Sequence, residues 1–251
     1  MIMLRRITLF ALLLFVGAVH AANPTFVAAS PSVQWGLANV TVNTVAGIAN
    51  DDILLIFIAS NAGEVPAISG FTAFESEDAA NFGIRHTGFW KRANGESGNY
   101  TTTGLTNGGF GFIAVIRGAA ASGNPINASD LTDKTNSGQA LTAGTITTTV
   151  NESLILFAVL AGADDTMSGW SGGGLTWTER LDAMEGTTLY VAAGLGTAPQ
   201  ATAGVITPAA TMDNVSAFAG MFAVAIAPLG GGGGGGTPVP VFLRHYQQQK
   251  Q

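Results

Sequence analysis

The sequence contains no cysteine, and this absence excludes several kinds of chemistry. Without thiols there can be no disulfide framework, thiol nucleophile, iron–sulfur cluster or cysteine-bound zinc. Charged residues are also scarce, at 10% of the 251 residues, with 10 basic and 16 acidic side chains. Because contacts to phosphate need clustered Lys and Arg, this balance argues against a nucleic-acid partner. The hydrophobic share is 47%, which is ordinary for a chain that folds around a core.

Residues 1–21 have the pattern of a secretory signal. Two arginines precede an uncharged, mostly apolar run at residues 7–19, and Val19-His20-Ala21 then supplies small residues before a cleavage point. The run is shorter than the roughly 20 residues that a spanning helix needs. We therefore expect cleavage after Ala21, export of the mature chain and no membrane span within it.

Residues 22–228 are expected to form an all-β domain. Segments rich in Val, Ile, Phe and Thr recur between clusters of Gly, Asn, Asp and Ser, without a sustained helical period. The clearest expected strands lie at residues 40–45, 53–59, 83–92, 110–117, 145–150, 154–160, 187–193 and 217–226. Residues 53–58 and 154–159 are continuous apolar runs, which would invite aggregation at an exposed edge. We therefore predict that both are central strands covered on both faces.

The second part of this domain repeats the first. Four pairs of segments correspond, at offsets of 101, 104, 101 and 110 residues: 53–60 with 154–162, 70–75 with 174–179, 89–95 with 190–196, and 112–116 with 222–226. Changes in loop length between two copies would produce such drift. We predict two half-units of about four strands each, interlocked as one sandwich. The alternative is two tandem domains of about 100 residues, each with a small core.

A resemblance to known proteins rests on the order of short motifs. They are Asp-Asp-Ile-Leu-Leu, Gly-Phe-Thr, an aromatic strand, Ile-Ala-Val-Ile-Arg-Gly, Gly-Asn-Pro-Ile-Asn, Thr-Ile-Thr-Thr-Thr-Val and Gly-Leu-Thr-Trp-Thr-Glu-Arg. From Pro24 to Pro228 this order resembles the two-half, jelly-roll-like β-sandwich modules of bacterial secreted proteins and of phage virion or tail-associated proteins. The resemblance implies a jelly-roll-like sandwich on a cell or virion surface, and it brings no shared catalytic motif.

The inventory of catalytic groups is thin. His86 is the single histidine of the expected sandwich, and no Gly-x-Ser-x-Gly elbow accompanies it. We expect it to be a partly exposed structural histidine on a strand. A glycosidase needs two carboxylates at a defined separation, and 16 acids always offer some pair. We therefore predict a non-enzymatic protein, with a carbohydrate-active enzyme as the least favoured hypothesis.

Acidic residues gather in several expected turns. Residues 50–52 (Asn-Asp-Asp) precede the first continuous apolar run, where such side chains typically bond to their own backbone. Asp164 and Asp165 follow the second run, and Glu64 lies in the corresponding loop of the first half. A further acidic cluster lies at residues 75–78. Loop carboxylates and carbonyls could serve calcium, although no Asp-x-Asp-x-Asp-Gly loop is present. We expect no cofactor other than this one candidate.

Trp170 gives the best indication of ligand binding. It stands in the small-residue segment 166–174, where we expect a flexible loop and an exposed ring that stacks on a sugar or a protein partner. The alternative is a ring that folds back as a lid over one end of the sandwich. Asp164 and Asp165 share this loop and fit the recognition of sugar hydroxyls. Trp170, Asp164 and Asp165 therefore form the predicted ligand-binding site.

The chain closes with a predicted glycine linker at residues 229–236 and a tail peptide at residues 237–251. The apolar part of the tail suits addition along the sheet edge of another subunit. The predicted docking residues are Val239, Val241, Phe242 and Leu243. The leading function hypothesis is an exported surface or virion module that binds or adheres to a surface glycan or a protein. The second is a structural subunit that assembles through its tail.

Overall fold

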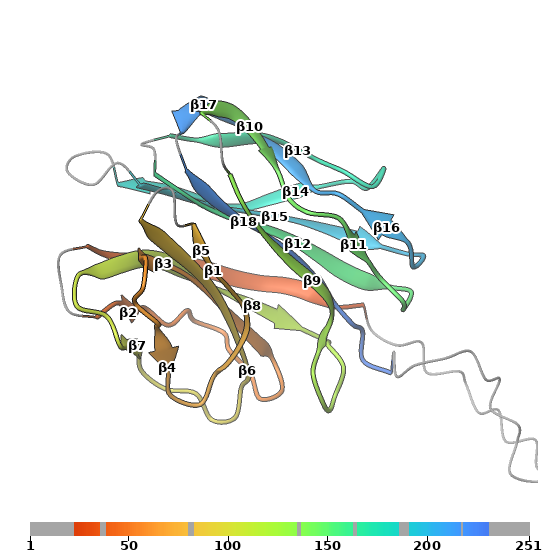
Figure 1. The fold of residues 1–251 in the computed structure, drawn as a ribbon. Coiled ribbons are helices and arrows are strands. Elements are labelled where there is room, and N and C mark those ends of the chain that lie inside the picture. Colours follow the sequence, from red (N-terminus) through yellow and green to blue (C-terminus); the bar gives the residue numbers. More distant parts are fainter. Residues whose placement is uncertain are drawn as a thin grey trace, which may run out of the picture.

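The computed structural model describes residues 23–35, 39–79, 83–134, 137–162, 165–185, 191–216 and 218–230. The predicted signal peptide, Asp164, most of the glycine linker and the whole tail peptide lie outside these residues. The described part is all-β, as the sequence predicts, and its strands form antiparallel sheets (Figure 1). It contains no helix of the length and apolarity needed to cross a membrane.

Two five-stranded sheets form the centre of the molecule, one from each half of the chain. The first half supplies β1 (Thr25–Trp35), β3 (Ile53–Asn61), β5 (Thr72–Ala79), β6 (Ile84–Arg92) and β8 (Gly108–Arg117). The second half supplies β9 (Ile126–Asp133), β12 (Ser153–Ala161), β14 (Thr178–Glu185), β15 (Val191–Gln200) and β18 (Ala219–Ile226). The strand orders are β1-β8-β3-β6-β5 and β14-β15-β12-β18-β9.

Smaller sheets lie on the outer faces, so that Figure 1 shows a stack of layers. On the first half they comprise β2 (Thr41–Val42), β4 (Ala67–Ile68) and β7 (Tyr100–Thr103), in the order β2-β7-β4. On the second half β10 (Gly138–Thr142), β13 (Met167–Ser171) and β17 (Ala209–Ser216) pair in the order β10-β17-β13. A further pair joins β11 (Ile146–Thr147) to β16 (Val205–Ile206).

The central strands β3 and β12 explain the two continuous apolar runs. Along β3, Phe57 and its alternate neighbours belong to the core between the two five-stranded sheets, while Ile56 and Ile58 belong to the core beneath the first outer sheet. Along β12, Leu156 faces the middle core and Phe157 faces the core beneath the second outer sheet. Because successive side chains point to opposite faces, a strand between two cores must be apolar at every position. The prediction of doubly covered central strands is confirmed.

The two halves follow the same plan. Read from its other end, the second sheet has the order β9-β18-β12-β15-β14. These strands correspond one by one to β1, β8, β3, β6 and β5 of the first sheet. A bulge at Val27 in β1 recurs at Asn127 in β9. A bulge at Phe74 in β5 recurs at Arg180 in β14. Bulges are specific local features of a strand, so their recurrence supports the predicted internal repeat.

Two details of the predicted repeat differ from the structure. Each half forms a complete five-stranded sheet, so the halves stack face to face instead of interlocking strand by strand. Ile53 of β3 pairs with Arg92 of β6, and the corresponding Leu154 of β12 pairs with Pro199 of β15. Equivalent positions of β6 and β15 are therefore 107 residues apart, not 101. Likewise β5 and β14 correspond at 106 residues, not 104. Strands of similar small and apolar residues resemble one another at several registers, and only the ladder of hydrogen bonds selects one.

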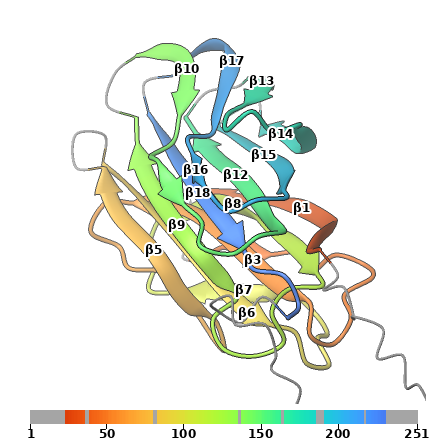
Figure 2. The ribbon, with the colours of Figure 1, turned by 90° about the vertical axis from the view of Figure 1, so that its right-hand side faces the viewer.

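The contact between the halves is reciprocal. The first strand of each half lies beside the outermost strand of the other half, since β1 contacts β14 and β9 contacts β5. Figure 2 shows β5 and β9 running side by side at one edge of the molecule. The same patch on both halves is used, as in the self-complementary interface of a two-fold dimer.

Candidate functional site

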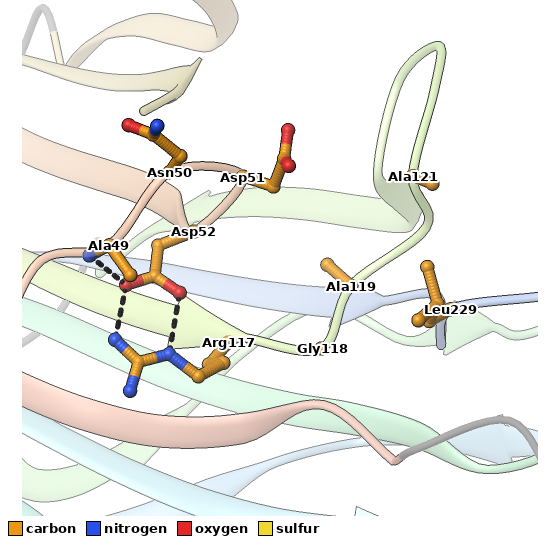
Figure 3. A pocket seen from close by; sticks show the side chains of 9 residues that line it. All are labelled: Ala49, Asn50, Asp51, Asp52, Arg117, Gly118, Ala119, Ala121 and Leu229. Carbon is orange, nitrogen blue, oxygen red and sulfur yellow. Dashed lines mark hydrogen bonds and ion pairs between the residues drawn. The ribbon is translucent and has the colours of Figure 1, made fainter. Parts of the chain in front are cut away.

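A pocket opens at the junction of the two halves, close to the end of the described chain (Figure 3). Its cavity volume is about 370 Å³, within the range of small-molecule sites. The turn before β3, the end of β8, the connector between the halves and the segment after β18 form its walls. The lining residues are Ala49, Asn50, Asp51, Asp52, Arg117, Gly118, Ala119, Ala121 and Leu229.

The turn before β3 holds Asn50 and Asp51 at the pocket. Asp51 has a φ of 69°, a left-handed conformation that Asp and Asn adopt more readily than other side chains. Its backbone N–H donates to the carbonyl of Ala93 at 2.9 Å, and the backbone N–H of Gly95 donates to Asn50 Oδ1 at 2.8 Å. The segment after β6 thus fixes the turn from outside. The side chain of Asp51 stays exposed, so its carboxylate is available to a ligand.

An ion pair between buried Asp52 and exposed Arg117 lies at the base of this turn. Asp52 is only 1% exposed, and its carboxylate accepts from Arg117 Nε at 2.9 Å and Nη2 at 2.8 Å. Its Oδ2 also accepts from the backbone N–H of Ala49 at 2.8 Å, and Arg117 Nη2 donates to the carbonyl of Gly47 at 2.7 Å. The hydrogen bonds to Asp52 and the charge of its carboxylate raise the pKa of Arg117. This two-point contact locks the pair, and Asn50 and Asp51 project away from it (Figure 3).

The second half repeats the turn but not the ion pair. In the equivalent turn, at residues 151–153, Glu152 has a φ of 61° and Asn151 Oδ1 accepts from the backbone N–H of Ala203 at 2.8 Å. Serine stands where the first half has its buried aspartate, and Ala227 stands at the position of Arg117. The fold therefore builds this turn without an ion pair. The ion pair beside the pocket is therefore a property that the first half adds.

Trp170 does not stand in a flexible loop. It lies in β13, half-buried, with its ring against the Gly196 backbone, where an added Cβ would overlap the ring. The ring meets Phe157 edge to face, with 5.6 Å between centroids and 78° between planes. Its Nε1–H donates to Glu179 Oε2 at 2.9 Å. Of the two alternatives for Trp170, the structure shows the folded-back ring, which covers the outer face of the second sheet.

Asp165 is a buried hydrogen-bond acceptor for Thr166 and Asn214. It is 3% exposed and accepts from the backbone N–H of Thr166 at 2.8 Å and from Asn214, through both the backbone and the side-chain amide. This arrangement pins the loop after β12 to the end of β17. Contrary to the prediction of a sugar contact, Asp165 is enclosed and engaged. Asp164, the third predicted ligand residue, lies outside the described residues.

Glu64 likewise fastens a loop of the first half through hydrogen bonds to backbone N–H groups. Its Oε1 accepts from the backbone N–H of Thr106 at 3.0 Å and of Asn107 at 3.2 Å, which pins the loop after β3 to the start of β8. Burial alone would raise the pKa of Glu64, but the hydrogen bonds from Thr106 and Asn107 lower it overall. The acids that the sequence places in corresponding loops are therefore matched structural clamps.

His86 is fully buried, contrary to the expected partial exposure. It lies in β6 and faces the other half, where Nδ1 is 2.7 Å from Asp133 Oδ1 of β9. The ring lies against Gly220, which has no Cβ to exclude it. Two lone pairs or protons at this contact have no partner, since His86 Nε2 and Asp133 Oδ2 are both buried without a hydrogen bond. An enclosed histidine of this kind cannot reach a substrate.

Within the described ranges no group of three or more His, Asp or Glu side chains is arranged to hold a metal ion. Calcium binding by loop carboxylates and carbonyls stays a prediction. Comparisons with protein-family models, with curated proteins and with solved structures find no match to this chain. The pocket beside Asp51 therefore stands as the candidate site on its geometry.

Proposed function

We propose that this protein is an exported, non-enzymatic surface module that binds a hydroxyl-rich ligand, such as the end of a surface glycan, in the pocket beside Asp51. One observation carries the proposal. The pocket is concave, it holds polar groups on a braced turn, and the first half builds it with an ion pair that the equivalent turn of the second half lacks.

The lining of the pocket suits a sugar. Asp51 presents a carboxylate and Asn50 a side-chain amide, and both groups pair well with neighbouring hydroxyls. Ala119, Ala121 and Leu229 form an apolar wall opposite them, and Leu229 is 42% exposed. A sugar ring has hydroxyls at its rim and C–H groups on its faces, so it can satisfy both kinds of wall. Arg117 neutralises Asp52, and the guanidinium of Arg92, which donates to the carbonyls of Asp51 and Ala120, brings a positive charge beside the carboxylate of Asp51. The site therefore has no strong excess of either charge, which suits a neutral ligand.

Two further considerations support a binding role outside the cell. The predicted signal at residues 1–21 would export the chain, and the lack of cysteine leaves folding independent of the redox state of the compartment. The enclosure of His86 removes the general base that acid–base hydrolysis most often uses. The molecule thus offers a rigid scaffold with a small polar pocket, which fits recognition better than turnover.

Replacing Asp51 with asparagine tests the proposal. Asparagine adopts the left-handed φ of this position as readily as aspartate, so the turn should persist while the charge is lost. A screen of the mature protein on a glycan array would identify a ligand, and titration calorimetry would measure its affinity. Loss of charge-assisted hydrogen bonds should weaken binding about ten- to a hundredfold.

Glu152→Gln is the matched control, since Glu152 occupies the same left-handed position in the second half. It should leave the affinity unchanged. Equal loss in both variants would show a general effect on the fold. Full affinity in Asp51→Asn, or an array without any glycan preference, would contradict the proposed function.

A further inference from the structure

The edge where β5 meets β9 carries a polar cluster that bridges the two halves. Glu75 and Glu77 lie on the face of β5 that looks toward the second half, because they pair across the ladder with Gly88 and with His86. Asp133 approaches from β9 and binds His86 Nδ1 at 2.7 Å. Ser129 of β9 donates its hydroxyl to Glu75 Oε1 at 2.6 Å. Both contacts join one half to the other, so this cluster is part of the interface.

The opposite edge shows that the fold does not require these polar groups. By the reciprocal arrangement of the halves, β1 and β14 form the equivalent edge. There Ala183 occupies the position of Glu77 and Leu181 that of Glu75. Ala193 stands at the position of His86. One edge of the interface is thus closed by apolar residues, whereas the other is closed by acids and a histidine. The second edge can change its charge with pH.

The cluster has an excess of negative charge. The groups that face it are Glu75 and Glu77 from β5, His86 from β6 and Asp133 from β9, while β18 contributes only Gly220. Asp130 lies on the other face of β9, where its carboxylate contacts Gly144, and only its charge reaches Glu77.

The nearby cations are engaged elsewhere. Arg85 points to the other face of β6, where it binds Asp78 and Ser76. Lys134, which follows β9, donates its ammonium to the carbonyl of Gly138. Among the described groups His86 is therefore the one basic side chain that faces the three carboxylates, and it already contacts Asp133. Two half-units that bring like charges together repel each other until protons are taken up.

We propose that the β5–β9 edge is an acid-strengthened clasp, in which Glu77, on the face that His86 shares with Asp133 of the other half, takes up a proton as the pH falls and thereby relieves the repulsion between the two halves. The device would hold the halves together most firmly in mildly acidic surroundings. At neutral pH the same edge is the weaker side of the interface.

The direction of the effect follows from Glu77. Burial, and then the charges of Asp133, Asp130 and Glu75, raise the pKa of Glu77, while His86 opposes them. A carboxyl group whose pKa is raised by folding binds its proton more tightly in the folded state than in the unfolded chain. The stability gained is fully present below the usual value of 4.5 and is lost as the pH rises through the raised pKa.

The test compares the melting temperature of the full chain with that of Glu77→Gln across the pH range. Glu77 is exposed at the mouth of the cluster, so glutamine fits without disturbing the core. At about pH 8 the variant should melt higher than the wild type by about 2–4 °C, because the neutral amide replaces an ionised group among like charges. The difference should shrink toward zero as the pH approaches 4.5, where Glu77 itself is protonated.

The difference in melting temperature between the two proteins removes the contribution of other titrating groups. Asp182 is one such group, since burial also raises its pKa. Asp78→Asn serves as the control, since Asp78 lies on the same strand but on the opposite face, beside Arg85. This variant should show no gain at alkaline pH. A difference between Glu77→Gln and wild type that is constant with pH, or a variant that melts lower at about pH 8, would overturn the clasp.

Discussion

Replacing Phe57 with alanine is expected to lower the free energy of unfolding by about 3–5 kcal/mol, which is typical of a fully buried aromatic residue. Phe57 is completely enclosed at the centre of the middle core. Its ring centroid lies 5.0 Å from that of Phe112, 6.2 Å from that of Phe74 and 5.0 Å from that of Phe222. Phe222 belongs to the other half, so the variant removes contacts within the first sheet and between the halves at once.

Chemical denaturation followed by tryptophan fluorescence would measure this loss. Because the largest apolar core joins the halves, we expect a single transition that moves to lower denaturant concentration with its slope unchanged. Val65→Ala is a suitable control, since Val65 is 63% exposed and its truncation should change stability by no more than about 0.5 kcal/mol. Two separate transitions, with only one of them shifted, would show that the halves are independent domains.

The second large effect is expected at Trp170. Truncation to alanine should lower the free energy of unfolding by about 2–4 kcal/mol, somewhat less than for a fully buried aromatic, since the ring is half-exposed. The loss has two sources. The ring covers Phe157 and the Gly196 backbone, and its N–H binds Glu179. Removing it opens the outer face of the second sheet to water.

Thermal melting of Trp170→Ala, together with ligand titration, separates the two roles considered for this residue. Glu179→Ala is the matched control, because it removes only the hydrogen-bond acceptor and should cost about 1 kcal/mol. A variant at Trp170 that keeps its melting temperature and loses affinity would instead identify a binding platform. In that case the second half, and not the pocket beside Asp51, would carry recognition.

Sequence pattern was sufficient for the strands that lie between two layers. The runs at residues 53–58 and 154–159 are apolar at every position, and such a pattern has no other place in an all-β protein than the middle of a covered sheet. The edge strands β1, β5, β9 and β14 were not among the clearest expected strands. They carry residues such as Glu77 and Asp130 because one side of an edge strand faces solvent or the polar rim of the interface, and this weakens the alternation on which the prediction rests.

Some residues of the candidate site could be predicted from local sequence, and others could not. The turn at residues 50–52 was recognisable from Asn and Asp beside an apolar run, and the structure shows Asp52 bonded to the backbone of Ala49 as expected. Its stronger partner, Arg117, lies 65 residues away in the chain, and no local pattern connects the two. The pocket exists only because the connector and the segment after β18 pass over this turn.

Local sequence alone determined the all-β class, the two central strands and the turns, since each depends on the alternation and backbone preferences of a few neighbouring residues. Tertiary structure alone decided which side chains became buried polar partners. His86 is enclosed because Gly220 leaves room for its ring and Asp133 meets it from the other half. Trp170 is a lid because glycines of β15 offer it a flat surface. In both cases the deciding residues come from strands far along the chain, and only the stacking of the sheets brings them together.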